Sequence, residues 1–249
     1  MLTSVLGGRA FAERHGSGTP RVVALHGWGR DRSDFNAVLA GTDALALDQP
    51  GFGATPDPET GWSTAEYADW LAAVLTELAA TSGGLKPIVM GHSFGGRVAV
   101  QTGARRPELI GGLVLTGVPL YRIESSAKPA LGYRLMRWAH TTGLLSDERM
   151  EAERRKRGSA DYRNASGVMR EVLVRAVSED YSDQVAAITV PTRLVWGEGD
   201  TAAPIWMAEK AHATIADSEL AVVPGAGHLI DDGLAQALRV AVEDLGGVA

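Results

Sequence analysis

The chain has 249 residues, of which 45% are hydrophobic and 22% charged, and its formal net charge is −6. A chain of this length and composition can bury a large core, and single α/β domains often reach this size. The net negative charge argues against general nucleic-acid binding, which needs a basic face to displace counterions. The sequence has no cysteine, which excludes disulfides and a cysteine nucleophile and fits a reducing compartment.

The first residues contain neither a charged segment nor a continuous apolar run of the kind found in secretion signals. No stretch of the sequence approaches the roughly 18 apolar residues of a membrane-spanning helix. We therefore expect a cytoplasmic protein without a membrane partner.

Short apolar runs alternate with amphipathic stretches of helical length, a pattern typical of a mostly parallel sheet covered by helices on both faces. The S-x-x-E form of Ser63 to Glu66 predicts a capped helix start. The expected strands are Leu2–Leu6, Phe11–His15, Val22–His26, Leu45–Asp48, Ile88–Met90, Leu113–Thr116, Thr192–Trp196 and Leu220–Val223. The expected helices are Asp34–Ala40, Ser63–Thr81, Phe94–Arg106, Pro204–Thr214 and Asp232–Leu245.

The stretch between the sixth and seventh expected strands is about 70 residues long, too long for a plain loop. It has helical character, and residues 121–164 carry ten Lys/Arg against six Asp/Glu on an otherwise acidic chain. We expect a helical cap at 119–189 inserted into a core formed by 1–118 and 190–249. Its basic surface either attracts an anionic or carrier-protein-bound acyl group or is an ordinary solvated face.

The segment Gly91-His-Ser-Phe-Gly95 fits the G-x-S-x-G nucleophile elbow, in which a serine stands on a tight strand-to-helix turn. Flanking glycines are needed because side chains there would strike neighbouring backbone. The alternative is that Ser93 only caps the following helix. In the elbow reading Ser93 is a nucleophile at a helix N-terminus, which favours developing negative charge.

A serine nucleophile needs a base, and the base needs an acid that orients it. His228 follows the last expected strand, and Asp200 follows the strand before it. The order Ser, Asp, His along the chain is that of an α/β hydrolase. Glu198 is the alternative acid. We expect His26 and His92 to form structural hydrogen bonds only.

An oxyanion formed during acyl transfer needs two backbone donors. The sequence predicts the amides of Phe94 and of Trp28, the latter in the glycine-rich loop 26–29. Arg97, four residues after Ser93, is a candidate for binding a substrate carboxylate or for pairing with a structural acid.

Taken together, five motifs resemble those of the α/β-hydrolase superfamily over nearly the whole chain. The resemblance implies a nucleophile at Ser93, a base at His228 and an acid at Asp200. It also implies oxyanion donors at Trp28 and Phe94, and a serine nucleophile argues against the epoxide hydrolases and haloalkane dehalogenases of the superfamily. The motifs are H-G-W-G at 26–29, D-x-P-G-x-G at 48–53, G-x-S-x-G-G at 91–96, G-x-G-D at 197–200 and G-x-G-H at 225–228.

We therefore expect a serine hydrolase that cleaves a small-molecule carboxylic ester through an acyl-enzyme, without metal or cofactor. The H-G-W-G form is similar to that of methyl ester esterases acting on pimeloyl carrier protein. The alternative is a C–C bond hydrolase or a lyase of the menaquinone-pathway type acting on an anionic substrate, because G-G-R at 95–97 is similar to that lyase. A receptor that keeps the three residues and signals through its cap is a third reading.

Overall fold

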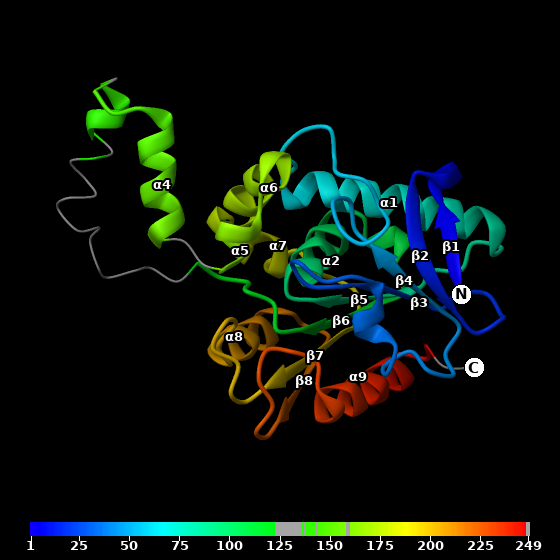
Figure 1. The fold of residues 1–249 in the computed structure, drawn as a ribbon. Coiled ribbons are helices and arrows are strands. Elements are labelled where there is room, and N and C mark those ends of the chain that lie inside the picture. The colour runs from blue at the N-terminus through cyan, green and yellow to red at the C-terminus, as the bar shows by residue number, and fades with distance from the viewer. Residues whose placement is uncertain (123–135, 137, 143, 158–159, 248–249) are drawn as a thin grey trace.

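An eight-stranded sheet runs through the molecule in the order β1-β2-β4-β3-β5-β6-β7-β8 (Figure 1). The computed structural model describes residues 1–122, 136, 138–142, 144–157 and 160–247. Strand β2 pairs antiparallel with β1 and β4, and all other neighbouring strands are parallel. The strands are β1 (Leu2–Val5), β2 (Ala10–His15), β3 (Val22–Leu25), β4 (Ala44–Asp48), β5 (Ile88–His92), β6 (Gly112–Thr116), β7 (Thr192–Gly197) and β8 (Ser218–Val223).

Helices lie on both faces of the sheet, and none in the described part of the chain is long and apolar enough to cross a membrane. Those that pack on the sheet are α1 (Thr64–Thr81), α2 (Phe94–Arg105), α8 (Trp206–Thr214) and α9 (Asp232–Asp244). Those between β6 and β7 are α4 (Asp147–Arg157), α5 (Ala160–Asn164), α6 (Gly167–Ser178) and α7 (Ser182–Ala186).

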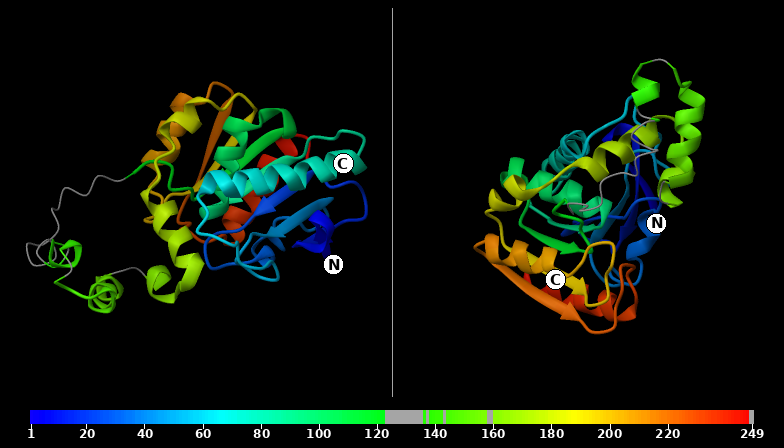
Figure 2. Two further views of the ribbon diagram at one scale, coloured as in Figure 1. Left: turned by 90° about the horizontal axis from the view of Figure 1, so that it is seen from above. Right: turned by 90° about the vertical axis from the view of Figure 1, so that its left-hand side faces the viewer.

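Both faces of the central strands are apolar, which is why these strands appear in the sequence as continuous hydrophobic runs. In β3, Val23 and Leu25 belong to the core cluster shared with α1, α2 and α8. Val22 and Ala24 point the other way, into a second cluster with residues 35–39 and α9. The central strands are therefore buried between two helical layers (Figure 2), and their ends are held at fixed positions.

All eight expected strands are confirmed, with small shifts at their ends. The expected helix Asp34–Ala40 is wrong: a 3₁₀ helix spans Arg32–Phe35, and turns follow it. The Asp31 side chain accepts a hydrogen bond from the Ser33 amide at 2.8 Å, which starts the helical turn earlier than the apolar pattern indicated. Gly41, with a positive φ of 82°, lies in the turn that leads into β4.

The predicted cap, residues 119–189, contains α4 to α7 in its described part. Helix α4 stands away from the sheet, whereas α6 lies close to α1 and α2 (Figures 1 and 2). Three of the basic residues that defined the segment, Lys128, Arg134 and Arg137, lie outside the described residues. The boundaries of a cap remain a prediction.

The two ends of this segment are joined to each other. The Tyr181 amide donates to the carbonyl oxygen of Leu120 at 3.0 Å, and the Arg122 amide donates to Asp180 Oδ2 at 2.9 Å. The chain therefore leaves and re-enters the core at one place.

A buried polar network fixes the returning chain to the core helices. Glu179 accepts hydrogen bonds from the Thr64 hydroxyl and from the Tyr181 hydroxyl, the latter at 2.7 Å. Gln101 of α2 donates to the Thr64 oxygen at 3.3 Å. Because each polar group of the network has a hydrogen-bond partner, the network joins α1, α2 and the α6–α7 connection with little loss of free energy from desolvation.

The capping box at the start of α1 gives a testable prediction of stability. Ser63 Oγ accepts from the Glu66 amide, and Glu66 accepts from the Ser63 amide at 2.7 Å. We expect Ser63→Ala to lower the free energy of unfolding by about 1 kcal/mol, because one helix-end donor loses its acceptor. Ser82→Ala at the other end of α1 is the matched control for urea denaturation, and an equal loss there would contradict the cap assignment.

Candidate active site

Ser93 occupies a tight turn between β5 and α2. Its backbone has φ of 50° and ψ of −111°, a conformation that residues with a side chain rarely adopt. Such a residue costs about 1–3 kcal/mol and persists only where its surroundings hold it. Here the Ser93 amide donates to the Thr116 carbonyl at 3.0 Å, and the Gly95 amide donates to the His26 carbonyl at 3.0 Å.

Three glycines make this turn possible because neighbouring atoms, backbone at Gly91 and Gly95 and the Val118 side chain at Gly96, fill the space of their missing side chains. A Cβ at Gly91 would lie 2.5 Å from the Cα of Gly96. A Cβ at Gly95 would overlap the carbonyl oxygen of Leu25, and one at Gly96 would overlap Val118. The prediction that side chains at positions 91 and 95 would strike neighbouring backbone is therefore confirmed.

The structure brings Ser93, His228 and Asp200 into one hydrogen-bonded chain. His228 Nε2 lies 3.1 Å from Ser93 Oγ, and His228 Nδ1 lies 2.8 Å from Asp200 Oδ2. Because the carboxylate only accepts, Nδ1 carries the proton and Nε2 is free to accept one from the serine. The three residues come from turns after β5, β7 and β8, at the same edge of the sheet.

Asp200 is held as a carboxylate behind the histidine, with only 1% of its side chain exposed. Burial alone would raise its pKa, but hydrogen bonds from His228 and from the Ala203 and Ala202 amides outweigh burial and lower the pKa. A Cβ at Gly117 would lie 3.1 Å from both Asp200 Oδ2 and His228 Nδ1. Gly117, which the sequence reasoning missed, thus leaves room for the pair.

The alternative residues of the sequence analysis have other partners. Glu198 accepts from the Gly225 amide at 3.3 Å and does not bond His228. His26 Nδ1 lies 2.8 Å from the Gly27 carbonyl, and His26 Nε2 accepts from the Gln49 amide at 3.1 Å. His26 is fully buried and structural, and burial lowers its pKa.

The amides of Trp28 and Phe94 have no hydrogen-bond acceptor within the described part of the chain. Their side chains pack edge to face, with ring centroids 5.3 Å apart, and Phe52 contacts both rings. This aromatic cluster holds the loop after β3 against the start of α2. Two unpaired N–H groups beside a serine can bind a developing oxyanion.

A cavity of about 480 Å³ opens over Ser93, a volume typical of small-molecule sites. Asp161 and Asn164 of α5 line it from the predicted cap. The sequence reasoning did not find these two residues, because only the folded chain brings α5 to the sheet edge. The cavity is lined by Gly27, Trp28, Gly29, Arg30, His92, Ser93, Asp161, Asn164, His228 and Leu229.

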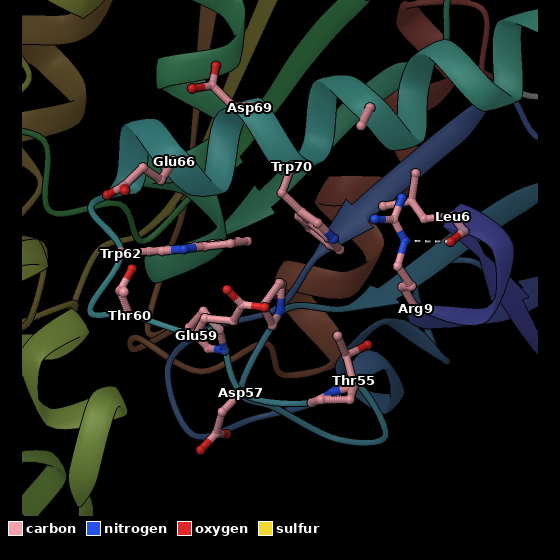
Figure 3. Close-up of a pocket in the computed structure, with 14 residues that line it drawn as sticks. Leu6, Arg9, Thr55, Asp57, Glu59, Thr60, Trp62, Glu66, Asp69 and Trp70 are labelled. Atoms are coloured by element: carbon pink, nitrogen blue, oxygen red, sulfur yellow. Dashed lines mark hydrogen bonds between the residues drawn. The ribbon is translucent and has the colours of Figure 1, made fainter.

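A second cavity, of about 580 Å³, lies between α1, the 50–62 loop and the turn after β1 (Figure 3). Trp62 and Trp70 form part of its wall. It shares no lining residue with the Ser93 cavity and includes no histidine. Of these two cavities, only the one over Ser93 is lined by a serine and by histidines.

Arg97 makes contacts that differ from both sequence alternatives. Its Nη1 donates to the Ala176 carbonyl of α6, and its guanidinium lies 5.9 Å from the centre of the Tyr181 ring. Arg97 does not line the Ser93 cavity. Its contacts join α2 to the returning end of the predicted cap, and a role toward substrate stays a prediction.

Among the described residues, no group of three or more His, Asp or Glu side chains is arranged to hold a metal ion. The polar groups around Ser93 are instead a hydroxyl, an imidazole, a carboxylate and backbone amides, the set that acyl transfer requires.

Comparison with known proteins identifies the family of the chain. Residues 22–241 match the alpha/beta hydrolase family. The chain belongs to this family. An esterase of Mycobacterium tuberculosis is 38% identical over 127 residues, which cover 50% of this chain and 41% of that protein. The 2-(acetamidomethylene)succinate hydrolase of Mesorhizobium japonicum is 26% identical over 240 residues, 87% of this chain and 84% of that protein.

Solved structures of other α/β hydrolases have the same fold. An esterase from Exiguobacterium antarcticum superposes with a TM-score of 0.72 at 21% identity, covering 98% of both chains. A meta-cleavage product hydrolase from Pseudomonas fluorescens gives 0.68 at 19% identity, covering 96% of this chain and 94% of that chain. These likenesses show the fold alone.

The glycines of the Ser93 turn give a stability prediction. We expect Gly95→Ala to lower the free energy of unfolding by about 1–3 kcal/mol or more, because the added methyl overlaps the Leu25 carbonyl. Gly227→Ala is the matched control in urea denaturation, since a Cβ there meets no atom within 4 Å. Equal losses in the two variants would contradict the assigned packing.

His92 gives a prediction of pH dependence. Burial, with a further contribution from the nearby His228, lowers the pKa of His92 to about 4. Between pH 6.5 and 4 the unfolded chain therefore binds a proton at His92 that the folded protein does not. We expect the free energy of unfolding to fall by about 3 kcal/mol from this residue as the pH drops through that range.

The measurement is urea denaturation from pH 7 to pH 4, compared with His92→Gln. Other groups, including His26 and Asp200, contribute equally to both proteins, so the difference in slope isolates His92. Parallel pH profiles for the two proteins would contradict the assignment.

Proposed function

We propose that this hydrolase-family protein is a serine hydrolase that cleaves a carboxylic ester through an acyl-enzyme intermediate. The distance of 3.1 Å between Ser93 Oγ and His228 Nε2 carries the proposal, because it places a base on the hydroxyl it must deprotonate. The names of relatives add support, since one is an esterase.

In this mechanism Ser93 Oγ attacks the ester carbonyl carbon while its proton passes to His228 Nε2. The tetrahedral oxyanion accepts hydrogen bonds from the Trp28 and Phe94 amides. Asp200 stabilises the imidazolium, which then gives its proton to the departing alcohol. A water molecule then gives a proton to His228 and attacks the acyl carbon; as the acyl–oxygen bond breaks, His228 returns the proton to Ser93 Oγ and the carboxylic acid leaves.

The segment 119–189 acts as a cap in this proposal. Support comes from Asp161 and Asn164, which line the cavity over Ser93 from outside the sheet. Arg30 also lines the cavity, but its guanidinium forms an ion pair with Asp34. With Arg30 neutralised and Asp161 present, the described lining has no surplus positive charge, which favours a neutral ester over an anionic one.

A second candidate is cleavage of a C–C or amide bond in an anionic substrate by the same residues. One relative is a succinate-derivative hydrolase that matches most of the chain. The two candidates are distinguished by comparing turnover rates on two sets of substrates. Fast hydrolysis of neutral p-nitrophenyl esters without cleavage of acidic diketones or acylated succinates favours the ester reaction. Cleavage of the acidic substrates without hydrolysis of the esters favours the second candidate.

We expect Ser93→Ala to lower kcat for p-nitrophenyl esters by roughly 10⁴–10⁶-fold, because removal of the nucleophile leaves only binding and oxyanion stabilisation. A fluorophosphonate should label the wild type at Ser93, as mapped by mass spectrometry, and should not label the variant. Ser82→Ala is the control and should retain full activity. Near-normal turnover by pure Ser93→Ala protein would refute the proposed mechanism.

A further inference from the structure

His92, the last residue of β5, has a fixed hydrogen bond to the backbone of the base. It is 2% exposed, and its Nε2 lies 2.9 Å from the carbonyl oxygen of His228. A carbonyl oxygen only accepts, so His92 Nε2 carries the proton and donates. The bond connects residues 136 positions apart and joins the strand that precedes Ser93 to the loop that carries His228.

The other side of the His92 ring packs on the loop that carries the Trp28 amide. A Cβ at Gly27 would lie 3.1 Å from His92 Nδ1 and 3.3 Å from its Cε1. Nδ1 is buried and has no hydrogen-bond partner among the described residues. An unpaired buried acceptor in a native structure calls for an explanation, because it costs stability.

We propose that His92 is a positioning residue, which sets the places of the His228 loop and the Gly27–Trp28 loop relative to Ser93. One side of the ring donates to the His228 carbonyl, and the other side is the surface against which Gly27 rests. This inference rests on the proposed function of Ser93. His92 itself does not bond Ser93 or Asp200, so it is not a second base.

The charge state of the side chain explains why histidine suits position 92 better than lysine or arginine. The rings of His92 and His228 have centroids 5.0 Å apart, and His228 becomes an imidazolium during the proposed reaction. A lysine or arginine could donate the same hydrogen bond but would place a second positive charge beside that imidazolium. Burial keeps His92 neutral at physiological pH, so it donates a hydrogen bond without opposing the charge on the base. The charged groups that act on it are His228, Asp200 and Asp34.

Loss of this bond should affect the chemical steps more than substrate binding. A misplacement of about 1 Å of a catalytic group can cost up to about 100-fold in rate. We therefore expect kcat to fall about 10–100-fold while KM changes less than about threefold.

The test compares His92→Gln with His92→Asn. The Gln amide nitrogen stands as many bonds from Cα as His Nε2, so it can donate to the His228 carbonyl. The Asn amide nitrogen stands where Nδ1 does and cannot reach it. Both variants are polar and similar in size, and circular dichroism and urea denaturation establish that each is folded. His212→Gln on the exposed side of α8 is the control.

The readouts are kcat and KM for p-nitrophenyl acetate and the rate of fluorophosphonate labelling of Ser93. We expect Asn to lower kcat and the labelling rate together, and Gln to restore most of both. Gln and Asn variants that are equally slow, an Asn variant with wild-type kcat, or a loss confined to KM would each overturn the positioning role.

A third variant covers the outcome in which His92→Asn does not fold. Gly27→Ala pushes a methyl group toward the ring, and we expect its loss of kcat to shrink in a His92→Gln background, where the amide can move aside. Additive losses would overturn the role. Failure of the proposed function is a separate result, because it appears as activity that survives Ser93→Ala.

Discussion

The left-handed backbone of Ser93 is the constraint on which the site depends. A serine in this conformation is unfavourable on its own, so the surrounding structure must stabilise it. The hydrogen bond from the Ser93 amide to the Thr116 carbonyl fixes one side of the turn, and the close contact of Gly91 with Gly96 fixes the other. Because both contacts come from strands and a helix buried in the core, core packing is what holds Ser93 in the wall of the cavity.

The same turn sets the electrostatics around the hydroxyl. It places the Phe94 amide at the first position of α2, where helix N–H groups have no partner within the helix. On the other side, a buried carboxylate at Asp200 faces the imidazole, and its pKa is lowered so that it remains charged. The imidazole therefore lies between an anion and a hydroxyl, with a neutral His92 behind it. This arrangement favours transfer of a proton from the hydroxyl to the imidazole.

Much of the architecture could be predicted from the sequence, because buried parallel strands and the residues after them leave strong local signals. Ser93 and Asp200 follow buried strands, and His228 follows β8, a parallel strand at the end of the sheet, so the hydrogen-bonded chain among them followed from topology. Arg97 was harder, because its partner is the Ala176 carbonyl, which belongs to a helix far away in the sequence. Gly117 has no motif around it, and its purpose becomes visible only when the space it leaves for Asp200 and His228 is known.

The joining of residues 120–122 to residues 180–181 bears on the length of chain that can lie between them. These two hydrogen bonds bring the chain that leaves β6 and the chain that returns toward β7 together at one point. The entropy of closing a loop also grows only slowly with its length. A change in the length of the chain between residues 122 and 180 therefore costs little free energy through loop closure and leaves the parallel pairing of β6 with β7 in register.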